Sequence, residues 1–200
     1  MEVVIATRNP GKLREIDALL APLGLRILSL ANFPEIPEII EDGRTFEENA
    51  AKKAVAVAAH TGRIAIADDS GLTVDALQGR PGVFSARYAG EGATDAERYR
   101  KLLEEMSGIL KEKRGAAFVC AIAVSSPEGK TETVVGLCRG EISLAPRGNH
   151  GFGYDPVFYL PDLGKTMAEL EPEIKNRISH RARALEKLKQ VLPNFLKKKQ

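Results

Sequence analysis

The order of apolar and polar positions predicts strands and helices in alternation. Residues 2–6 are an apolar run rich in Val and Ile, typical of a buried strand, and a polar turn at 7–12 follows it. Apolar side chains then recur at helical spacing over 13–23, and Gly24 ends that pattern. Residues 25–30 predict a second strand, so the chain opens with a βαβ-type unit.

Two further helices are predicted to begin at capping boxes, in which a Thr is followed three residues later by a Glu. Thr45 and Glu48 open an Ala-rich helix that ends at Gly62, and Thr94 and Glu97 open another. Such a box satisfies backbone N–H groups that the first turn of a helix leaves without a partner.

More strands are predicted at 64–67, directly before Asp68-Asp69-Ser70-Gly71, and at 116–124 and 131–138, which a hairpin turn separates. Leucines at helical spacing over 185–192 predict a C-terminal helix. Strands that alternate with helices, with one long hairpin, predict an α/β fold built on a mixed sheet.

Composition is ordinary for a globular protein. With 200 residues, 44% hydrophobic and 28% charged, the chain is expected to form a single domain over 1–200 with a sizeable core. No apolar run approaches the roughly 20 residues of a membrane-spanning helix, and the N-terminus does not resemble a secretory signal. Cys120 and Cys138 form no C-x-x-C pair, so two buried thiols and a cytoplasmic location are expected.

The charge balance argues against a nucleic-acid partner. A formal net charge of +2 leaves no large basic face, and no membrane partner is expected either. The lysines at 197–199 are interpreted as a solvated helix end, because lysines there suit the helix dipole without further purpose.

The turn after the first predicted strand is a candidate phosphate site. Its residues are Thr7, Arg8, Asn9, Pro10, Gly11 and Lys12. The start of a helix presents free backbone N–H groups and a positive dipole end, and Lys12 adds a cation. The segment lacks the spacing of a P-loop, so an ordinary capped turn stays open as the alternative.

Asp68 and Asp69 follow a buried strand, where carboxylates are costly to desolvate unless a positive or hydrogen-bonding group meets them. A divalent cation such as Mg²⁺ is one such partner, and capping of a turn is the structural alternative. Successive side chains of an extended segment point in opposite directions. We therefore expect one Asp to serve the metal or the attacking water, and the other to serve the structure.

Three further polar clusters are candidates for a site. The acidic turn 38–43 supplies either a metal carboxylate or mere surface charge. In 148–156, glycines flank two aromatic residues, which suits a flat ligand on which a ring stacks. Lys175 follows, and then Ser179-His180-Arg181, which starts a helix that either faces an anion or carbonyl or forms a solvated edge.

Taken together, these segments resemble the inosine triphosphate pyrophosphatase family, whose members are also called non-standard purine NTP or dITP/XTP pyrophosphatases. The similarity spans almost the whole chain, in the order of the family. The matching segments are ATRNPGK (6–12), TFEENAAKKA (45–54), ADDSGLTVDALQGRPGVFSARYAG (67–90), GFGYDP (151–156) and SHRARAL (179–185).

The resemblance implies an elongated mixed β-sheet with flanking helices, two lobes around a central cleft, and a homodimer. It implies Mg²⁺-dependent hydrolysis of dITP, ITP and XTP to monophosphate and pyrophosphate, which keeps such bases out of DNA and RNA. Asp69 would be the catalytic proton acceptor and, with Glu41, a metal ligand, while residues 7–12 would bind the triphosphate. The remaining substrate contacts would be Ser70, Phe152, Gly153, Tyr154, Asp155, Lys175, His180 and Arg181.

Three other functions compete with this interpretation: a nucleotide-binding module without turnover, a nucleic-acid-binding factor, and a phosphatase that releases single phosphates. The preferred interpretation requires the acidic strand end and the phosphate turn to face each other. If Asp69 lay far from Lys12, the proposed chemistry would have no site.

Overall fold

The computed structural model describes residues 2–196, so the lysines at 197–199 lie outside the described residues. The β-strands are β1 (Glu2–Ile5), β2 (Arg26–Ser29), β3 (Ile64–Val74), β4 (Gly115–Ser125), β5 (Thr131–Ile142), β6 (Phe158–Leu160) and β7 (Lys165–Thr166). The α-helices are α1 (Pro10–Leu20), α2 (Phe46–Thr61), α3 (Asp95–Glu105), α4 (Pro172–Ile178), α5 (His180–Val191) and α6 (Pro193–Leu196). Short 3-10 helices join several of these elements, among them η4 (Gly82–Arg87).

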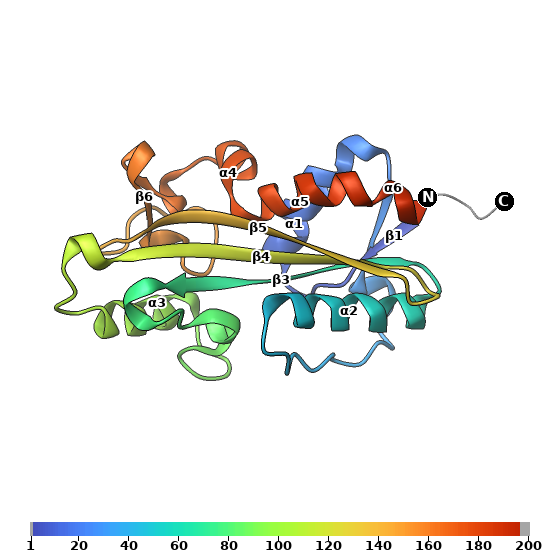
Figure 1. Ribbon diagram of the computed structural model, residues 1–200, viewed down its shortest axis with the longest axis horizontal. Coiled ribbons are helices and arrows are strands. Elements are labelled where there is room, and N and C mark those ends of the chain that lie inside the picture. The colour runs from blue at the N-terminus through green and yellow to red at the C-terminus, as the bar shows by residue number, and fades with distance from the viewer. Residues whose placement is uncertain (1, 197–200) are drawn as a thin grey trace. The chain divides into compact units, whose positions relative to one another are not determined.

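The strands form one mixed sheet in the order β2-β1-β3-β4-β5-β6-β7 (Figure 1). β1 runs parallel to both neighbours, with Val4 opposite Leu28 on β2 and Ala65 on β3. β6 runs antiparallel to β5 and β7. The predicted α/β class and mixed sheet are confirmed, as is the opening βαβ unit. The arrangement of two lobes around a central cleft stays a prediction.

The chain divides into two compact units. Unit 1 consists of residues 1–69, 120–136 and 181–200, and unit 2 of residues 70–119 and 137–180. Strands β3, β4 and β5 each contribute residues to both units.

Unit 1 is built from strands that bury alternate side chains on opposite faces. One face carries Ile5, Ile66 and Ile122, which pack in a single cluster with leucines of α1 and α5 such as Leu20 and Leu188. Helix α2 covers the other face (Figure 1). Its buried side is made mainly of Ala and Val, small side chains that let the helix lie close to the sheet.

Unit 2 has its own apolar core. Leu102 and Met106, from α3 and its C-terminal end, belong to one cluster with Leu72 of β3, Phe118 of β4 and Phe158 of β6. The capping box of Thr94 and Glu97 that opens α3 is confirmed. None of the helices described in residues 2–196 has the length and apolarity needed to span a bilayer.

Two local predictions need correction. The strand expected at 64–67 continues to Val74, because cations and hydrogen-bond donors meet the two aspartates and allow them to stay within the sheet. Thr45 caps α2 as predicted, but the Glu48 carboxylate accepts from Arg44 N–H at 2.7 Å, one residue earlier than a capping box requires. Gly43 N–H donates to Asn49 Oδ1 at 2.8 Å, which ties the acidic turn 38–43 to the first turn of α2.

Candidate active site

The predicted phosphate turn forms a tightly capped helix start at the end of β1. The Asn9 side chain accepts from Gly11 N–H at 2.8 Å and from Lys12 N–H at 3.1 Å, and Pro10 occupies the first helical position. Arg8 turns away to donate to the Ile36 carbonyl at 2.9 Å. The cap fixes the first turn of α1 and with it the position from which the Lys12 side chain extends.

The side chains of Asp68 and Asp69 point to opposite faces of the sheet. Because side chains alternate along β3, Asp68 shares the face of Ile66, and Asp69 shares that of Ala67. The first face is covered by α1 and α5, and the second by α2 (Figure 1). The two carboxylates therefore meet different sets of side chains.

Asp68 lies in a buried cluster of charges. Lys12 Nζ is 3.2 Å from its Oδ1, and Arg181 Nη2 donates to its Oδ2 at 2.9 Å. Arg181 Nη1 in turn pairs with Glu15 on α1. Cys120 Sγ donates a weak hydrogen bond to Asp68 Oδ2 across 3.8 Å. Lys12 thus brings the phosphate turn to Asp68, in the middle of β3. That Lys12 also faces Asp69 across a substrate site stays a prediction.

The surrounding cations decide the protonation state of Asp68. Burial by itself would raise the pKa of this carboxyl, but Lys12, Arg181 and Lys53 hold that pKa well below its usual range. Asp68 is therefore an anion neutralised by the protein's own side chains, which indicates a structural role. Arg181 is only 1% exposed, so its guanidinium is engaged inside unit 1, and its predicted contact with substrate stays a prediction.

Asp69 has a different environment on the α2 face. Asn49 Nδ2 donates to its Oδ2 at 3.0 Å, and Lys53 Nζ lies 3.9 Å from its Oδ1. Burial raises the pKa of the Asp69 carboxyl above its ordinary value. Lys53 and Lys12 counteract this rise, and the negative charge of Glu41 adds to it. A carboxylate with raised proton affinity suits a group that takes a proton from water.

Glu41 comes from the acidic turn and is held against the same helix. Lys53 Nζ lies 3.0 Å from Glu41 Oε1, and Gly43 N–H donates to Asn49 Oδ1 at 2.8 Å. A Cβ atom at Gly43 would lie 2.6 Å from that oxygen, so this close approach requires glycine. The turn is therefore fixed to α2, and Glu41 and Asp69 converge on one lysine.

Glu41 and Asp69 are the carboxylates predicted to hold Mg²⁺. Both offer oxygen atoms, the donor type that Mg²⁺ prefers, and Mg²⁺ is commonly held by one or two carboxylates together with substrate phosphates. Their convergence on Lys53 Nζ shows that a cation is favoured between them. Across residues 2–196, no group of three or more His, Cys, Asp or Glu side chains is arranged to hold a metal. The two carboxylates fit the predicted ion.

In unit 2, the glycine-rich segment 151–156 surrounds a buried ion pair. Lys175 Nζ, from α4, lies 2.5 Å from Asp155 Oδ2, and the same oxygen accepts Phe152 N–H at 2.9 Å. Lys175 Nζ also lies 4.6 Å from the centroid of the Phe152 ring. Three residues predicted to hold the base therefore form one cluster.

Two more predicted base contacts are buried in unit 2. The Tyr154 hydroxyl donates to the Ser85 carbonyl at 2.9 Å, and burial raises the pKa of Tyr154, which keeps it neutral. The His180 ring stacks on Phe118, with 4.8 Å between centroids and an interplanar angle of 19°. Ser179 precedes α5 as expected, so His180 begins that helix.

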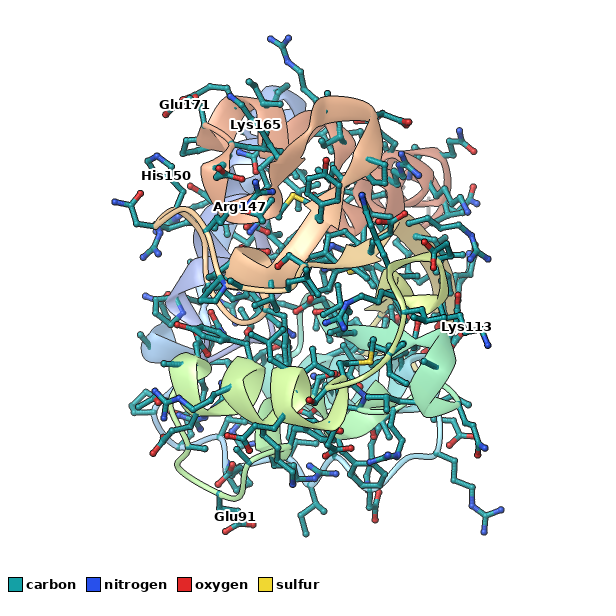
Figure 2. The ribbon with its side chains drawn as sticks, turned by 90° about the vertical axis from the view of Figure 1, so that its left-hand side faces the viewer. Glu91, Lys113, Arg147, His150, Lys165 and Glu171 are labelled. Carbon is teal, nitrogen blue, oxygen red and sulfur yellow. The ribbon has the colours of Figure 1, made fainter. Side chains whose placement is uncertain are left out.

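The residues just before the segment 151–156 are exposed. His150 is exposed, with Nε2 3.9 Å from Glu171 Oε1, and both lie on the same edge of unit 2 as Arg147 and Lys165 (Figure 2). The inward-facing part of the glycine-rich segment therefore begins at Phe152.

Comparison with known proteins identifies the family. The family model described as the Ham1 family matches residues 3–191. The chain belongs to the Ham1 family. A relative from Geobacillus kaustophilus, named dITP/XTP pyrophosphatase, is 58% identical over 94% of this chain and 92% of its own length. A Bacillus subtilis relative with the same name is 54% identical over 96% of each chain.

Solved structures agree with this assignment. A HAM1 protein from Coxiella burnetii matches with a TM-score of 0.88 and 47% identity, over 97% of this chain and 99% of that one. A Ham1 protein from Staphylococcus aureus matches with a TM-score of 0.87 and 41% identity. The family resemblance and the fold class predicted from the sequence motifs are confirmed.

In this Ham1 family chain, the predicted site residues fall into two groups. Unit 1 contains Thr7, Arg8, Asn9, Pro10, Gly11, Lys12, Glu41, Asp69 and Arg181, and unit 2 contains Ser70, Phe152, Gly153, Tyr154, Asp155, Lys175 and His180. Each group has an internal network of ion pairs and hydrogen bonds. The role of each residue toward substrate stays a prediction.

The sequence motifs predict no specific role for Asn49, Lys53 or Glu15. Asn49 and Lys53 lie one helical turn apart on the buried side of α2, at 1% and 8% exposure, amid Ala and Val. Two polar side chains on an otherwise apolar helix face are the pattern that identifies them. Lys53 Nζ also donates to the backbone carbonyl of Asp68 at 2.8 Å. Lys53 therefore contacts the β3 backbone as well as the carboxylates of Glu41 and Asp69.

Proposed function

We propose that this chain is a nucleoside triphosphate pyrophosphatase that hydrolyses dITP, ITP and XTP to the monophosphate and pyrophosphate. The observation that carries this proposal is the divided carboxylate pair: Asp68 is neutralised by Lys12 and Arg181, whereas Asp69 has a raised pKa beside Lys53. A candidate base and a carboxylate that carries a phosphate-binding cation are thereby adjacent on β3. Relatives that are 50–60% identical carry the corresponding name.

Residues 7–12 and Lys53 bind the phosphates. The capped start of α1 offers a positive dipole end, and Lys12 stands at its first turn. Glu41 and Asp69 would hold Mg²⁺, and the bound ion would supply positive charge beside the phosphates. Positioning and electrostatics dominate reactions of this kind, so little covalent chemistry is asked of the protein.

Asp69 acts as the general base. Its carboxylate accepts a proton from water as the water oxygen attacks the α-phosphorus, and the bond from that phosphorus to the bridging oxygen breaks. The electron pair of that bond leaves with pyrophosphate. Asn49 orients the carboxylate by donating to its Oδ2.

Unit 2 binds the base and the sugar. The Phe152 ring stacks on the purine. The other proposed substrate contacts are Ser70, Gly153, Tyr154, Asp155, Lys175, His180 and Arg181. Lys175, whose Nζ lies 4.6 Å from the centroid of the Phe152 ring, is the proposed donor to the 6-oxo group. Adenine presents a 6-amino donor there, and such a mispaired buried group gives discrimination of about 10⁴-fold.

One assay tests the activity. The protein is incubated with dITP, ITP, XTP, ATP or GTP, with and without Mg²⁺, and pyrophosphate and orthophosphate are measured separately. We expect pyrophosphate from the first three substrates, little from ATP, and loss of product on chelation. Equal turnover of ATP would contradict the base specificity, and orthophosphate as the product would instead support a phosphatase.

We further propose that the protein is a cytoplasmic homodimer formed by one pyrophosphatase domain per chain, with no nucleic-acid or membrane partner. These assignments rest on the family resemblance, the near-neutral net charge and the two thiols buried on strands. Light scattering coupled to size-exclusion chromatography tests the dimer. A monomer at micromolar concentration would contradict it.

A further inference from the structure

Residues 151–156 of unit 2 are the proposed base loop, and three of the hydrogen bonds that hold this loop come from different elements. Phe152 N–H donates to Asp155 within the loop, and the Tyr154 hydroxyl donates to the Ser85 carbonyl of η4. The third bond runs from Gly153 N–H to Asp95 Oδ2 at 2.7 Å. Consecutive backbone amides of the loop are therefore each bound by a carboxylate.

Asp95 is the first residue of α3 (Figure 1), 58 positions before Gly153 in the sequence. Its other oxygen, Oδ1, accepts from Arg98 Nη1 at 2.7 Å, and Arg98 Nη2 donates to the Ala93 carbonyl at 2.5 Å. The carboxylate is thus held between one partner on its own helix and one partner on the base loop. A bond from a backbone amide to an ionised carboxylate is stronger than one to a neutral acceptor.

Asp95 is not needed to start its helix. Thr94 Oγ1 accepts from Glu97 N–H at 3.2 Å, and Glu97 Oε2 accepts from Thr94 N–H at 2.7 Å, so the capping box closes without Asp95. The carboxylate at 95 is therefore available to bind the loop, and its removal leaves the helix start capped.

We propose that Asp95 is a positioning residue for substrate specificity, which fixes the base loop at Gly153 and thereby sets the orientation of the Phe152 ring. This inference rests on the proposed function of the loop as the base-binding segment. Gly153 has a positive φ of 64°, so its peptide is held in a left-handed conformation that the bond to Asp95 stabilises. Without that bond, the loop samples other conformations, and the ring loses its fixed place.

The test compares Asp95→Ala and Asp95→Ser, which are too short to reach Gly153, with Asp95→Asn, which keeps an acceptor oxygen. Arg98→Met is the matched control, because it removes the other partner of Asp95 and leaves the loop bond. Two properties are measured on the full-length chain: steady-state kinetics with ITP and ATP, and amide hydrogen exchange of residues 151–154.

For Asp95→Ala and Asp95→Ser, we expect KM for ITP to rise about tenfold, since one charge-assisted hydrogen bond is lost, with a much smaller change in kcat. The preference for ITP over ATP falls, and exchange at Gly153 becomes faster. Arg98→Met stays close to the parent protein in all of these. Asp95→Asn, which keeps a neutral acceptor, lies between the parent protein and Asp95→Ala. The serine variant answers the question if the alanine variant does not fold.

Unchanged exchange at Gly153 in the folded Asp95→Ser variant would overturn the proposal, and so would an Arg98→Met variant with the same KM rise as Asp95→Ala. The exchange measurement does not depend on catalysis. If the parent protein fails to hydrolyse ITP while Gly153 is protected only when residue 95 offers an acceptor, the proposed function fails and the anchoring role stands.

Discussion

Asp68 and Asp69 are neighbours in the sequence, but they occupy two chemically different regions of unit 1. On the face of α1 and α5, Asp68 is bound by Lys12 and Arg181, and its pKa is lowered. On the face of α2, Asp69 is bound by the neutral amide of Asn49, and its pKa is raised. The same side chain therefore has opposite proton affinities at adjacent positions.

The difference shows how a β-strand can place two adjacent carboxylates in environments that suit different roles. Alternation along β3 gives each carboxylate its own helix, and each helix supplies a different balance of burial and positive charge. Pairs of acids whose environments push their pKa values apart commonly have different roles. Asp68 bonds to Lys12 of α1 and Arg181 of α5, and Asp69 is the proposed proton acceptor.

The largest expected effect comes from Asp69→Asn. The amide cannot take a proton from water, so we expect kcat for ITP to fall about 10³-fold, the range typical of general-base removal. The variant should be as stable as the parent protein, because the substitution replaces a carboxylate that burial disfavours with a neutral isostere. Pyrophosphate release and urea unfolding measure the two quantities. Near-normal turnover would show that the chemistry does not depend on this face.

Asp68→Asn is expected to change stability instead. Removing one partner of a buried ion pair leaves Lys12 and Arg181 undercompensated, which lowers the free energy of unfolding by about 3 kcal/mol. Glu15 still pairs with Arg181, so the loss should lie at the low end of the range for such sites. Urea denaturation measures it. A loss of kcat as large as that of Asp69→Asn, with unchanged stability, would reverse the two assignments.

The pH dependence of unfolding sharpens this second prediction. Because the native pKa of Asp68 is lowered, its stabilisation is complete above the unfolded value of about 3.9 and is lost as the pH falls toward the native pKa. Asp68→Asn should therefore flatten the acid side of the stability curve. If the free energy of unfolding of Asp68→Asn fell as steeply at low pH as that of the parent protein, other carboxylates would be responsible for the loss of stability in acid.

Helix caps and the direction of strand side chains can be predicted from nearby residues, whereas contacts between residues far apart in the sequence cannot. The capping role of Thr45 depends on residues within four positions, so it is predictable. Helix α1 begins at Pro10, inside the predicted turn 7–12, because Asn9 caps it three residues before the apolar pattern starts. The opposed directions of Asp68 and Asp69 follow from the alternation of an extended strand. Arg181 is 113 residues from Asp68, and no local pattern shows that its guanidinium reaches that carboxylate.

The extension of β3 beyond residue 67 was missed for the same reason. Two aspartates inside a buried strand contradict local preference, and they are tolerated only because Lys12, Lys53 and Asn49 arrive from other elements. Partners chosen by tertiary structure override local propensity at this site, and sites of this kind are where sequence reasoning is expected to fail.

Asn49→Ala tests how the α2 face tunes Asp69. The substitution removes the donor to Oδ2, so the carboxylate loses one hydrogen bond to its charged form, and we expect kcat/KM to fall about tenfold. Lys52→Ala is the matched control on the same helix, because Lys52 pairs with Asp42, which is exposed. The control should leave kcat/KM unchanged. Equal losses in both variants would indicate a general effect on α2 rather than an effect on Asp69.

The smallest expected effect concerns Cys120, which lies on the Asp68 face. Burial raises the pKa of its thiol well above the usual range and Asp68 adds to the rise, so Cys120 stays a neutral donor. Cys120→Ala and Cys138→Ala each remove a buried sulfur, but only the first removes a hydrogen bond to Asp68. The difference between their free energies of unfolding should be about 0.5 kcal/mol. Neither should change kcat, because the proposed proton acceptor is Asp69 on the other face. A clear loss of kcat in Cys120→Ala alone would show that the two faces are coupled.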